Sequence, residues 1–582
     1  MNRLVHQTIF YITFFLGKSL ISQELSTITK QQPFDIKGSI SLTGNGYIAD
    51  GIPNRFSPLG WMISGTPTIS LYGVQIPFSI MISEQNKDFS QPFARFGLSP
   101  TYKSLKLHLG HRYMTFNPYT LSGRNFLGAG IEWNPKIFRF AAMYGSFSSE
   151  NLDDTAALYN SSSINKPNTI KPTYRQMGYG LKLGAGSKSQ HAEIMMFRGY
   201  DVYEGRNIDF NRAIIKPRDN IAIGANTHFT FAKMITWDIK VGASVFTRDV
   251  TRDSLVLKSS DSSLLRSINS FFPIRTSTQL SWAGETSINF NYKNIGCGLT
   301  YKRIMPEYKS LGIFYIQGDL EQYFIAPSAV VWKNKLSLSG NLGIQRDNLA
   351  GIKESTNNSI MGAINVGFQA NDKFGIDASY SNFGITQRPT IFGGIPDTTL
   401  IDQINHNATL TPRYTWIDDK KVINLILSLN YQQLVDLNRT TEVFTNSRNF
   451  TGVATHTLNL LQKKMDFTTS FTYNNTHSVI DIVNLGLSYS MNKLLAKDKL
   501  RIGGGISYFT NIYEGQKAGD TYSGNISTNY TIDAMHSLQA GYSILINNGQ
   551  FSGVINSFSE HRFNVGYVFN FSGIKLNSQK SK

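Results

Sequence analysis

The strongest constraint on this chain is a stretch near its end, Phe563 to Phe571, in which apolar and polar side chains alternate. Side chains of a strand point to its two faces in turn, so this segment has one apolar, aromatic face and one polar face. Its length matches the roughly 9–11 residues that a tilted strand needs to cross a bilayer. Taken alone, it fits a membrane-spanning strand or a half-buried strand of a soluble sandwich. The apolar face carries Phe563, Val565, Tyr567, Phe569 and Phe571.

Five further segments in the second half of the chain repeat this alternation. One such segment is weak evidence, but five with turn residues between them predict a sheet of consecutive antiparallel strands. The segments are Ile423 to Tyr431, Met465 to Tyr473, Val483 to Met491, Tyr522 to Ile532 and Leu538 to Ile546.

The connections alternate between short turns and long loops. The short turns are rich in Asn, Asp, Lys and Pro, which favour tight reversals; they are Asn134 to Lys136, Lys333 to Lys335, Asn371 to Lys373, Asp418 to Lys420 and Lys497 to Lys499. The long loops include Ser149 to Thr173, Glu204 to Asp219, Thr251 to Thr276 and Arg388 to Asn405. This pattern is typical of an outer-membrane barrel with periplasmic turns and extracellular loops. We therefore predict an all-β fold, a single transmembrane antiparallel up-and-down β-barrel of about 26 strands.

Composition agrees with this fold class. Of the 582 residues, 41% are hydrophobic and only 16% are charged, and the chain holds 38 Phe, 28 Tyr and 49 Gly. No run of about 18 apolar residues follows the first 25 positions, which excludes a helical membrane protein. A soluble all-β array remains the alternative.

The first residues indicate an export signal. Arg3 precedes a short apolar core, Thr8 to Gly17, and Ser22 offers a small residue for cleavage. We expect a signal peptide over residues 1–22 and one domain, the outer-membrane β-barrel, over residues 23–582. Cys297 is the only cysteine, so an intrachain disulfide and a lipoprotein anchor are both excluded.

Taken together, these features resemble the large plugless outer-membrane β-barrel proteins of the Bacteroidota. The resemblance rests on the signal end Leu20 to Gln23 (LISQ), the Tyr- and Phe-rich alternating strands, and the aromatic last strand. It implies that this strand, Phe563 to Phe571, is the signal by which the barrel-assembly machinery recognises the chain for insertion. The chain departs from the usual form because Ser572 to Lys582 follow the aromatic strand.

Motifs for catalysis are lacking, so we expect no enzymatic activity, no cofactor and no metal. The sequence contains no GxSxG or HExxH motif and no paired cysteine ligands. Gly503 to Gly505 lies within a strand pattern and lacks the Lys-Ser/Thr of a phosphate loop. His108, His111 and Arg112 cluster on one strand, where a metal site is one interpretation and scattered lumen histidines are the other.

One long loop contains a pattern of helical spacing. Asp261 or Ser262 can begin a helix and Pro273 ends it. An amphipathic helix there must bury its apolar stripe, either in the lumen as a constriction or against neighbouring loops at the rim. The stripe consists of Leu264, Leu265, Ile268, Phe271 and Phe272.

Positive charge is the second candidate functional feature. The formal net charge is +17, and removal of the signal peptide with Arg3 and Lys18 leaves +15. The strand pattern sends a basic set to the polar face, against Glu132 and Glu193, and a basic lumen attracts anions. The alternative is that the charge faces lipopolysaccharide at turns and rims. The set comprises Arg95, Lys106, His108, Arg112, Arg139 and Lys182.

Three function classes follow for a protein of the cell outer membrane. We favour a porin-like channel or solute transporter; the alternative is a structural or secretion-associated barrel whose lumen is filled by a partner protein. A TonB-dependent receptor is not expected, because its plug domain has no place before the first strand near Phe34. Expected partners are outer-membrane lipid, lipopolysaccharide and the barrel-assembly machinery, with no nucleic acid. A barrel this wide needs inward loops or a partner if it is to avoid leaking.

Overall fold

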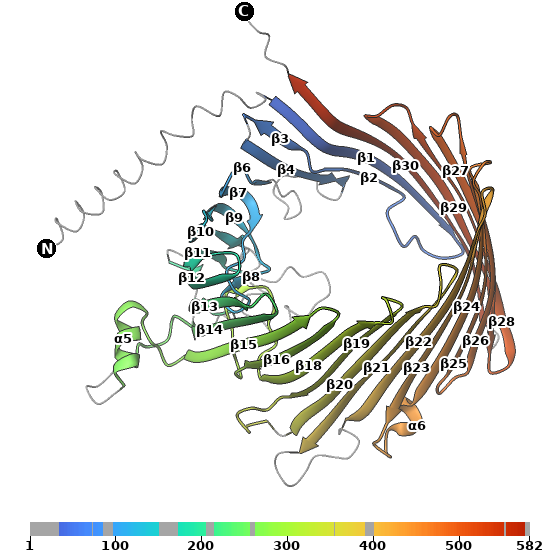
Figure 1. Ribbon diagram of the computed structural model, residues 1–582. Helices are drawn as coiled ribbons and strands as arrows, with labels where there is room; N and C mark the ends of the chain where they lie inside the picture. Colours follow the sequence, from blue (N-terminus) through green and yellow to red (C-terminus); the bar gives the residue numbers. More distant parts are fainter. Residues whose placement is uncertain are drawn as a thin grey trace, which may run out of the picture.

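The computed structural model describes residues 34–72, 74–84, 97–150, 173–204, 215–256, 262–353, 355–389, 401–551 and 554–576 (Figure 1). These residues form one closed antiparallel β-barrel. The main sheet has 28 strands, but β2 and β3 together fill one position of the wall, as do β5 and β6. Within the described residues, 26 strands therefore surround the lumen, and the predicted fold class is confirmed.

The strands of the wall follow one another in chain order. The first are β1 (Phe34–Asp50), β2 (Leu59–Gly65), β3 (Thr68–Leu71), β4 (Val74–Ser83), β5 (Gly97–Leu98), β6 (Thr101–Tyr102), β7 (Leu105–Tyr113), β9 (Asn125–Trp133), β10 (Phe138–Ser148), β11 (Arg175–Gly186), β12 (Gln190–Val202) and β13 (Asp219–Phe231). They continue with β14 (Ile235–Thr247), β15 (Thr278–Tyr292), β16 (Ile295–Ile304), β18 (Leu320–Val331), β19 (Leu336–Arg346), β20 (Ser355–Gln369), β21 (Phe374–Pro389) and β22 (Asp402–Ile417). The last are β23 (Lys421–Asp436), β24 (Ser447–Leu460), β25 (Met465–His477), β26 (Ile482–Leu495), β27 (Leu500–Tyr513), β28 (Gln516–Thr531), β29 (His536–Phe551) and β30 (Val554–Leu576).

The seam of the barrel lies between its first and last strands. β1 and β30 pair antiparallel from Asp50 opposite Ser559 to Phe34 opposite Leu576. A sheet that closes on itself leaves no edge strand with unpaired N–H and C=O groups. The closed wall is therefore the arrangement that lets strands cross a layer without water.

One position of the wall is broken for a local reason. β2 ends at Gly65 and β3 begins at Thr68, and between them Pro67 has no N–H to donate to the ladder. The Thr66 N–H still reaches the Ser39 carbonyl at 3.2 Å, so the chain keeps its path along β1. The break at Pro67 thus divides one position of the wall into two short strands.

The turns at one end of the barrel are tight and use left-handed backbone conformations. Lys333 and Asn334 between β18 and β19 have φ of 56° and 66°, and Lys497 and Asp498 between β26 and β27 have φ of 55° and 72°. The long connections lie at the other end, called the long-loop end below. This arrangement matches the alternation of turns and loops that the sequence predicts.

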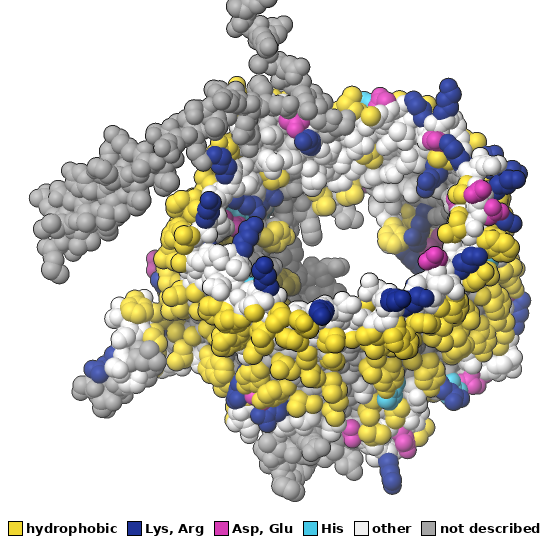
Figure 2. Space-filling view, in the orientation of Figure 1, with side chains coloured by type: hydrophobic (Ala, Val, Ile, Leu, Met, Phe, Trp, Pro, Cys, Tyr) yellow, Lys and Arg dark blue, Asp and Glu magenta, His cyan; other side chains and the backbone are white. Residues whose placement is uncertain are grey.

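The outward face of the wall is apolar. Figure 2 shows a band of hydrophobic side chains around the visible outside of the barrel. Ile194 in β12 is 66% exposed, and Leu342 in β19 and Leu487 in β26 are more than half exposed. Their sequence neighbours face inward and are mostly small and polar, as a period of two requires. The band is the surface that a barrel presents to lipid.

Two helices are described outside the wall's strands, α5 (Ser263–Phe271) and α6 (Glu442–Thr445). Neither of these, nor any other helix among the described residues, has the length and apolar character needed to cross a membrane.

Candidate functional site: a lumen with two unlike halves

Two long connections fold into the barrel and cover part of its inner wall. Residues 114–124 join β7 to β9, and residues 305–319 join β16 to β18; we call these the inward loops. They meet in a short parallel ladder, β8 (Leu121–Ser122) with β17 (Gly312–Ile313), which lies inside the barrel (Figure 1). The wall from β7 to β18, which they cover, is called the lined arc.

The first inward loop is fixed to the wall by side-chain hydrogen bonds. Asn117 donates from Nδ2 to Asn226 Oδ1 at 2.6 Å and to the Val241 carbonyl at 3.2 Å. Its Oδ1 accepts the Tyr119 N–H at 2.6 Å, which shapes the loop itself. Tyr119 then lies over Gly242, where a Cβ would stand 2.5 Å from the tyrosine Cβ. A glycine at position 242 therefore leaves the space on the inner wall that Tyr119 of the loop occupies.

The second inward loop is held by the first and by the wall. Tyr308 donates its hydroxyl to the Tyr119 carbonyl at 2.6 Å, and Ser310 donates to the Thr120 carbonyl at 2.6 Å. The Leu311 N–H reaches Asn220 Oδ1 at 3.0 Å. Burial raises the pKa of both Tyr119 and Tyr308, with the charge of Glu285 adding to the effect at Tyr119. Both phenols therefore stay neutral and serve as fixed hydrogen-bonding groups.

Apolar side chains from loops and wall form a core within the barrel. The side chains of this core are buried against one another, as in the interior of a soluble protein. Its larger cluster comprises Met114, Phe116, Leu121, Phe126, Ala141, Met143, Met195, Phe197, Phe246 and Leu311, and its smaller one Tyr119, Ala283, Ile304, Tyr308 and Leu320.

Arg124 ties the end of the first inward loop to the other connections at the long-loop end. It donates to Gln176 Oε1 at 2.5 Å and to the Leu311 carbonyl, and Gln176 in turn donates to Asp201 Oδ1 at 2.8 Å. Asp201 also accepts from Arg218 Nε at 2.9 Å. Burial and repulsion by Arg218 lower the pKa of Arg124 to about 10, so the guanidinium remains charged at neutral pH. The network fixes the loops at neutral pH.

Directly below the inward loops, the lined arc carries a row of paired charges. His108 Nε2 lies 2.6 Å from Glu132, and Lys240 Nζ lies 3.3 Å from Glu285. Glu193 holds two cations, Arg139 at 3.2 Å and Lys182 at 3.5 Å. Acids and bases are therefore interspersed around this side of the lumen. We call the row the charged belt; it comprises Lys106, His108, Glu132, Arg139, Lys182, Glu193, Lys240 and Glu285.

The basic set expected from sequence meets partners in this belt. Lys106, His108, Arg112, Arg139 and Lys182 lie on the inner face of their strands, whereas Arg95 falls outside the described residues. Arg112 donates to the backbone carbonyls of Pro77 and Gly97, so it supports the wall. Neighbouring strands bring Glu132 and Glu193 to the same inner face as the predicted basic set, and three of its members, His108, Arg139 and Lys182, are paired with these acids.

The histidines of the metal-site interpretation have other contacts. His108 lies between Glu132 and the Ser99 hydroxyl, 3.5 Å from its Nδ1. His111 occupies the opposite face of the same strand. Across the described residues, no group of three His, Cys, Asp or Glu side chains is placed to hold a metal ion.

The predicted helix forms as α5, but it does not enter the lumen. Figure 1 shows α5 projecting outward from the long-loop end near β14 and β15. Phe271 is 66% exposed, while Phe272 is buried and its ring lies 5.8 Å from the guanidinium of Arg198, on the outward face of β12. This contact anchors the end of the helix to the outside of the wall, which corrects the constriction interpretation. Ile268 is partly buried, and the side chains of Leu264 and Leu265 lie outside the described residues.

The inner wall from β19 to β29 has a different chemistry; we call it the open arc. Its inward side chains are mainly Ser, Thr, Asn and Gly, linked across strands. Asn474 donates to Thr451 at 2.7 Å, and Asn449 donates to Thr476 at 2.6 Å. Neither apolar cluster of the inward loops includes a residue of this arc. The open arc therefore presents a neutral, hydrogen-bonding surface to the lumen.

The last strand has the orientation expected for a lipid-facing segment. Phe563 and Val565 are exposed on the outward face of β30, whereas Asn564 lies on the inner face beside Gly541. Tyr567, also outward, has its hydroxyl 2.6 Å from His536 Nδ1 in β29, and Phe569 lies 4.9 Å from the same ring. Phe571 pairs through its backbone with Gly38, and its side chain lies outside the described residues.

Between the two arcs, the described residues leave an opening through the barrel (Figure 2). Sequence reasoning missed the inward loops that narrow it. A signal was present: glycines such as Gly224 and Gly242 interrupt the inner faces of wall strands, where an incoming loop packs against the backbone. The arrangement can pass or hold a hydrophilic molecule, with charge on one side and neutral hydrogen-bonding groups on the other.

Comparison with known proteins does not show a family for this chain. No protein-family model matches the sequence, and no curated protein matches it significantly. Among solved structures, the chain is similar to OccAB2 of Acinetobacter baumannii at 11% identity and a TM-score of 0.30, covering 66% of this chain and 98% of that one. It is similar to the translocation pore of the P pilus usher PapC at 9% identity and a TM-score of 0.34, covering 94% and 100%. It is also similar to the ferric enterobactin receptor PfeA of Pseudomonas aeruginosa at 10% identity and a TM-score of 0.39. That match covers 93% of this chain and 81% of the receptor.

Proposed function

We propose that this protein is a porin-like channel of the Gram-negative outer membrane that passes hydrophilic solutes. The observation that carries the proposal is the opening between the lined arc and the open arc, bounded by polar side chains in a wall whose outside is apolar (Figure 2). Barrels of 16–18 strands already enclose an aqueous channel. A wall of 26 strands has room for the inward loops and for a water-filled path beside them.

The paired charges of the lumen favour weak ionic selectivity. In the charged belt, Glu193 lies against Arg139 and Lys182, and Glu285 lies against Lys240. In the open arc, Arg413 pairs with Asp377 and the remaining inner surface is largely neutral. A solute with hydroxyl and amide groups can exchange hydrogen bonds with water for those of the open arc. We therefore expect neutral polar solutes to pass as readily as small ions.

A second candidate is a secretion-associated barrel filled by a partner protein. The observation in its favour is the open arc itself, a broad inner surface that neither apolar cluster of the inward loops reaches. A partner would have to be hydrophilic, because the exposed groups are amides and hydroxyls such as those of Asn474 and Thr451. The resemblance to plugless barrels of the Bacteroidota is compatible with both candidates.

Reconstitution of the purified protein separates the two. A channel gives stepwise conductance in planar bilayers, and liposomes that contain it swell in neutral sugars up to a size limit. The control is the same preparation with an unrelated barrel protein of known closed lumen. Absence of conductance, together with a stoichiometric protein that co-purifies from native membranes, would favour the partner-filled barrel.

A further inference from the structure

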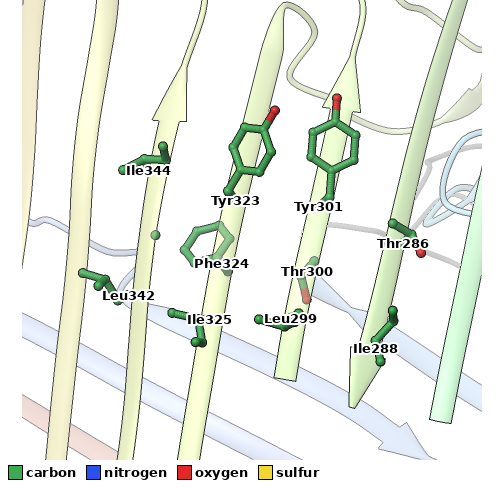
Figure 3. Close-up of a pocket in the computed structure, with 11 residues that line it drawn as sticks. Thr286, Ile288, Leu299, Thr300, Tyr301, Tyr323, Phe324, Ile325, Leu342 and Ile344 are labelled. Atoms are coloured by element: carbon green, nitrogen blue, oxygen red, sulfur yellow. The ribbon is translucent and has the colours of Figure 1, made fainter. Parts of the chain in front are cut away.

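The outward face of the wall contains an apolar groove across β15, β16, β18 and β19 (Figure 3). Its volume is about 510 Å³. Figure 3 shows Leu299, Ile325 and Leu342 on three neighbouring strands, with the hydroxyls of Tyr301 and Tyr323 pointing the same way above them. A groove of this size, lined mainly by apolar side chains, can hold one flexible apolar chain.

Strand register arranges the groove in three rows. Leu299, Ile325 and Leu342 are opposite one another, and so are Tyr301, Tyr323 and Ile344 in the next row. Arg303, Glu321 and Arg346 form the third row, nearest the long-loop end. Rows two residues apart are separated by about 6.6 Å, because a strand rises about 3.3 Å per residue. The surface thus changes from aliphatic to aromatic to charged over about 13 Å.

The charged row presents cations outward. Glu321 accepts hydrogen bonds from Tyr301 Oη at 2.9 Å and Arg303 Nη1 at 3.2 Å, and it pairs with Arg346. The carboxylate is 2% exposed, whereas the side chain of Arg346 is 57% exposed. The acid therefore fixes the two arginines from behind. A guanidinium has five N–H donors, so donors remain for an external anion.

Lys353 is likewise an exposed cation that is paired with a buried acid. Lys353 is 48% exposed and lies 3.0 Å from Asp347, and it pairs with the largely buried Asp319. The hydrogen bond from Lys353 and the N–H groups of Asn348 and Leu349 outweigh burial and hold the pKa of Asp319 below its usual value. Asp319 thus stays charged, and the accessible atoms at this end of the groove are again those of the cation.

From this arrangement we infer that the groove binds lipopolysaccharide, with one acyl chain in the apolar rows and a phosphate on Arg303 and Arg346. The inference rests on the proposed function in the outer membrane, where long loops are extracellular, so that the long-loop end lies at the outer leaflet. An acyl chain fits the aliphatic row, and a phosphate can accept two parallel hydrogen bonds from an arginine fork. The tyrosine hydroxyls lie between the two, where the polar–apolar boundary of an amphiphile falls.

Native mass spectrometry of the delipidated full-length protein tests the inference. The probes are diphosphoryl lipid A, phosphatidylglycerol and phosphatidylethanolamine, each added in mixed micelles. Wild type should retain lipid A preferentially. The double variant R303Q/R346Q should weaken lipid A binding at least about tenfold, as expected for loss of charge-assisted hydrogen bonds. Leu342→Trp, which fills the groove without adding charge, should weaken it as well.

The matched control is Arg413→Gln, which removes an arginine paired with an acid inside the lumen. Equal loss of lipid A binding in this control would overturn the inference, and so would equal affinity of wild type for phosphatidylglycerol, which would assign the groove to phospholipid. Heat-modifiable mobility on gels reports whether each variant is folded. Channel conductance should be unchanged in R303Q/R346Q. Wild type that conducts but does not bind lipid A refutes only this inference, whereas lack of conductance with lipid A bound refutes only the channel.

Discussion

The lined arc and the open arc have the same kind of side chains on the outside of the barrel and different kinds on the inside. Both present alternating apolar side chains outward, such as Ile194 in β12 and Leu487 in β26. Inside, the lined arc buries Ala222 and Phe197 beneath the inward loops, while the open arc exposes Ser, Thr and Asn. The outward surface is set by lipid and is uniform. The inward surface depends on what each part of the wall contacts in the lumen. The barrel is therefore divided into a packed half, the lined arc, and a hydrophilic half, the open arc.

The largest expected effect comes from placing a charge on the inner face of each arc. Ala222 is fully buried between Asn220 and Gly224, which both contact the inward loops. Ala222→Arg should cost about 4 kcal/mol or more, because it overpacks a core and buries an unpaired charge. Ser488→Arg, on the inner face of the open arc, should change stability by less than about 0.5 kcal/mol. Urea unfolding in micelles, followed by tryptophan fluorescence, measures both.

If Ser488→Arg proved as damaging as Ala222→Arg, the open arc would be covered in the folded protein. That result would also favour a partner-filled barrel over a channel.

The same charge placed outward should remove the difference between the arcs. Ile194→Arg and Leu487→Arg both put a guanidinium on the lipid face, where the cost is about 2–4 kcal/mol near the midplane. Similar penalties are expected, because the bilayer and not the lumen sets them. Unfolding from lipid vesicles gives the two values. A cost confined to the lined arc would show that the open arc does not face lipid.

Asn564→Arg is the matched control for the outward series. It lies on the inner face of β30, beside outward Val565. Val565→Arg should carry the lipid-face penalty, and Asn564→Arg should not. The pair tests the face assignment of the last strand within two adjacent residues.

A smaller effect is expected from uncoupling the charged belt. Glu193→Gln leaves Arg139 and Lys182 without their shared acid and should cost about 1–3 kcal/mol, the range for an unsatisfied partly buried group. Asp466→Asn is the control in the open arc, where the described contact is a hydrogen bond from Asn492 at 2.8 Å. That change should stay within about 0.5 kcal/mol. Equal costs would mean that the belt does not depend on pairing.

The wall could be predicted from sequence because its rules are local. The alternation from Phe563 to Phe571 and the turn at Lys333 to Lys335 are fixed by neighbours along the chain. The inward loops could not be predicted in this way. Tyr308 bonds to Tyr119 across 189 positions of sequence, and only the closed barrel brings them together.

The candidate site shows the same limit. Periodicity predicts that Arg112 and Arg139 lie on the inner face, but it cannot show that Arg112 binds backbone carbonyls or that Arg139 meets Glu193 across two strands. The pattern around Phe271 predicts a helix correctly, yet the side of the wall on which it lies depends on the contact of Phe272 with Arg198. Local patterns determine elements and faces, and contacts distant in sequence determine which charges are paired.

The smallest expected effect is on ion selectivity, and it follows from the pairing in the lined arc. An anion-selective lumen needs unpaired cations, but the belt offers Arg139 and Lys182 bound to Glu193. The reversal potential of wild type across a KCl gradient should therefore lie near zero. Glu193→Gln should shift it toward anions, and Asn226→Asp, which adds an acid beside Glu193, should shift it toward cations. Each shift should shrink between 0.1 and 1 M salt, because the screening length falls from about 10 Å to about 3 Å. A strong anion preference in wild type would contradict the paired-charge interpretation of the belt and place the selective cations elsewhere in the lumen. Opposite shifts from the two variants would instead show that permeating ions pass within reach of the belt, along the boundary between the packed half and the hydrophilic half.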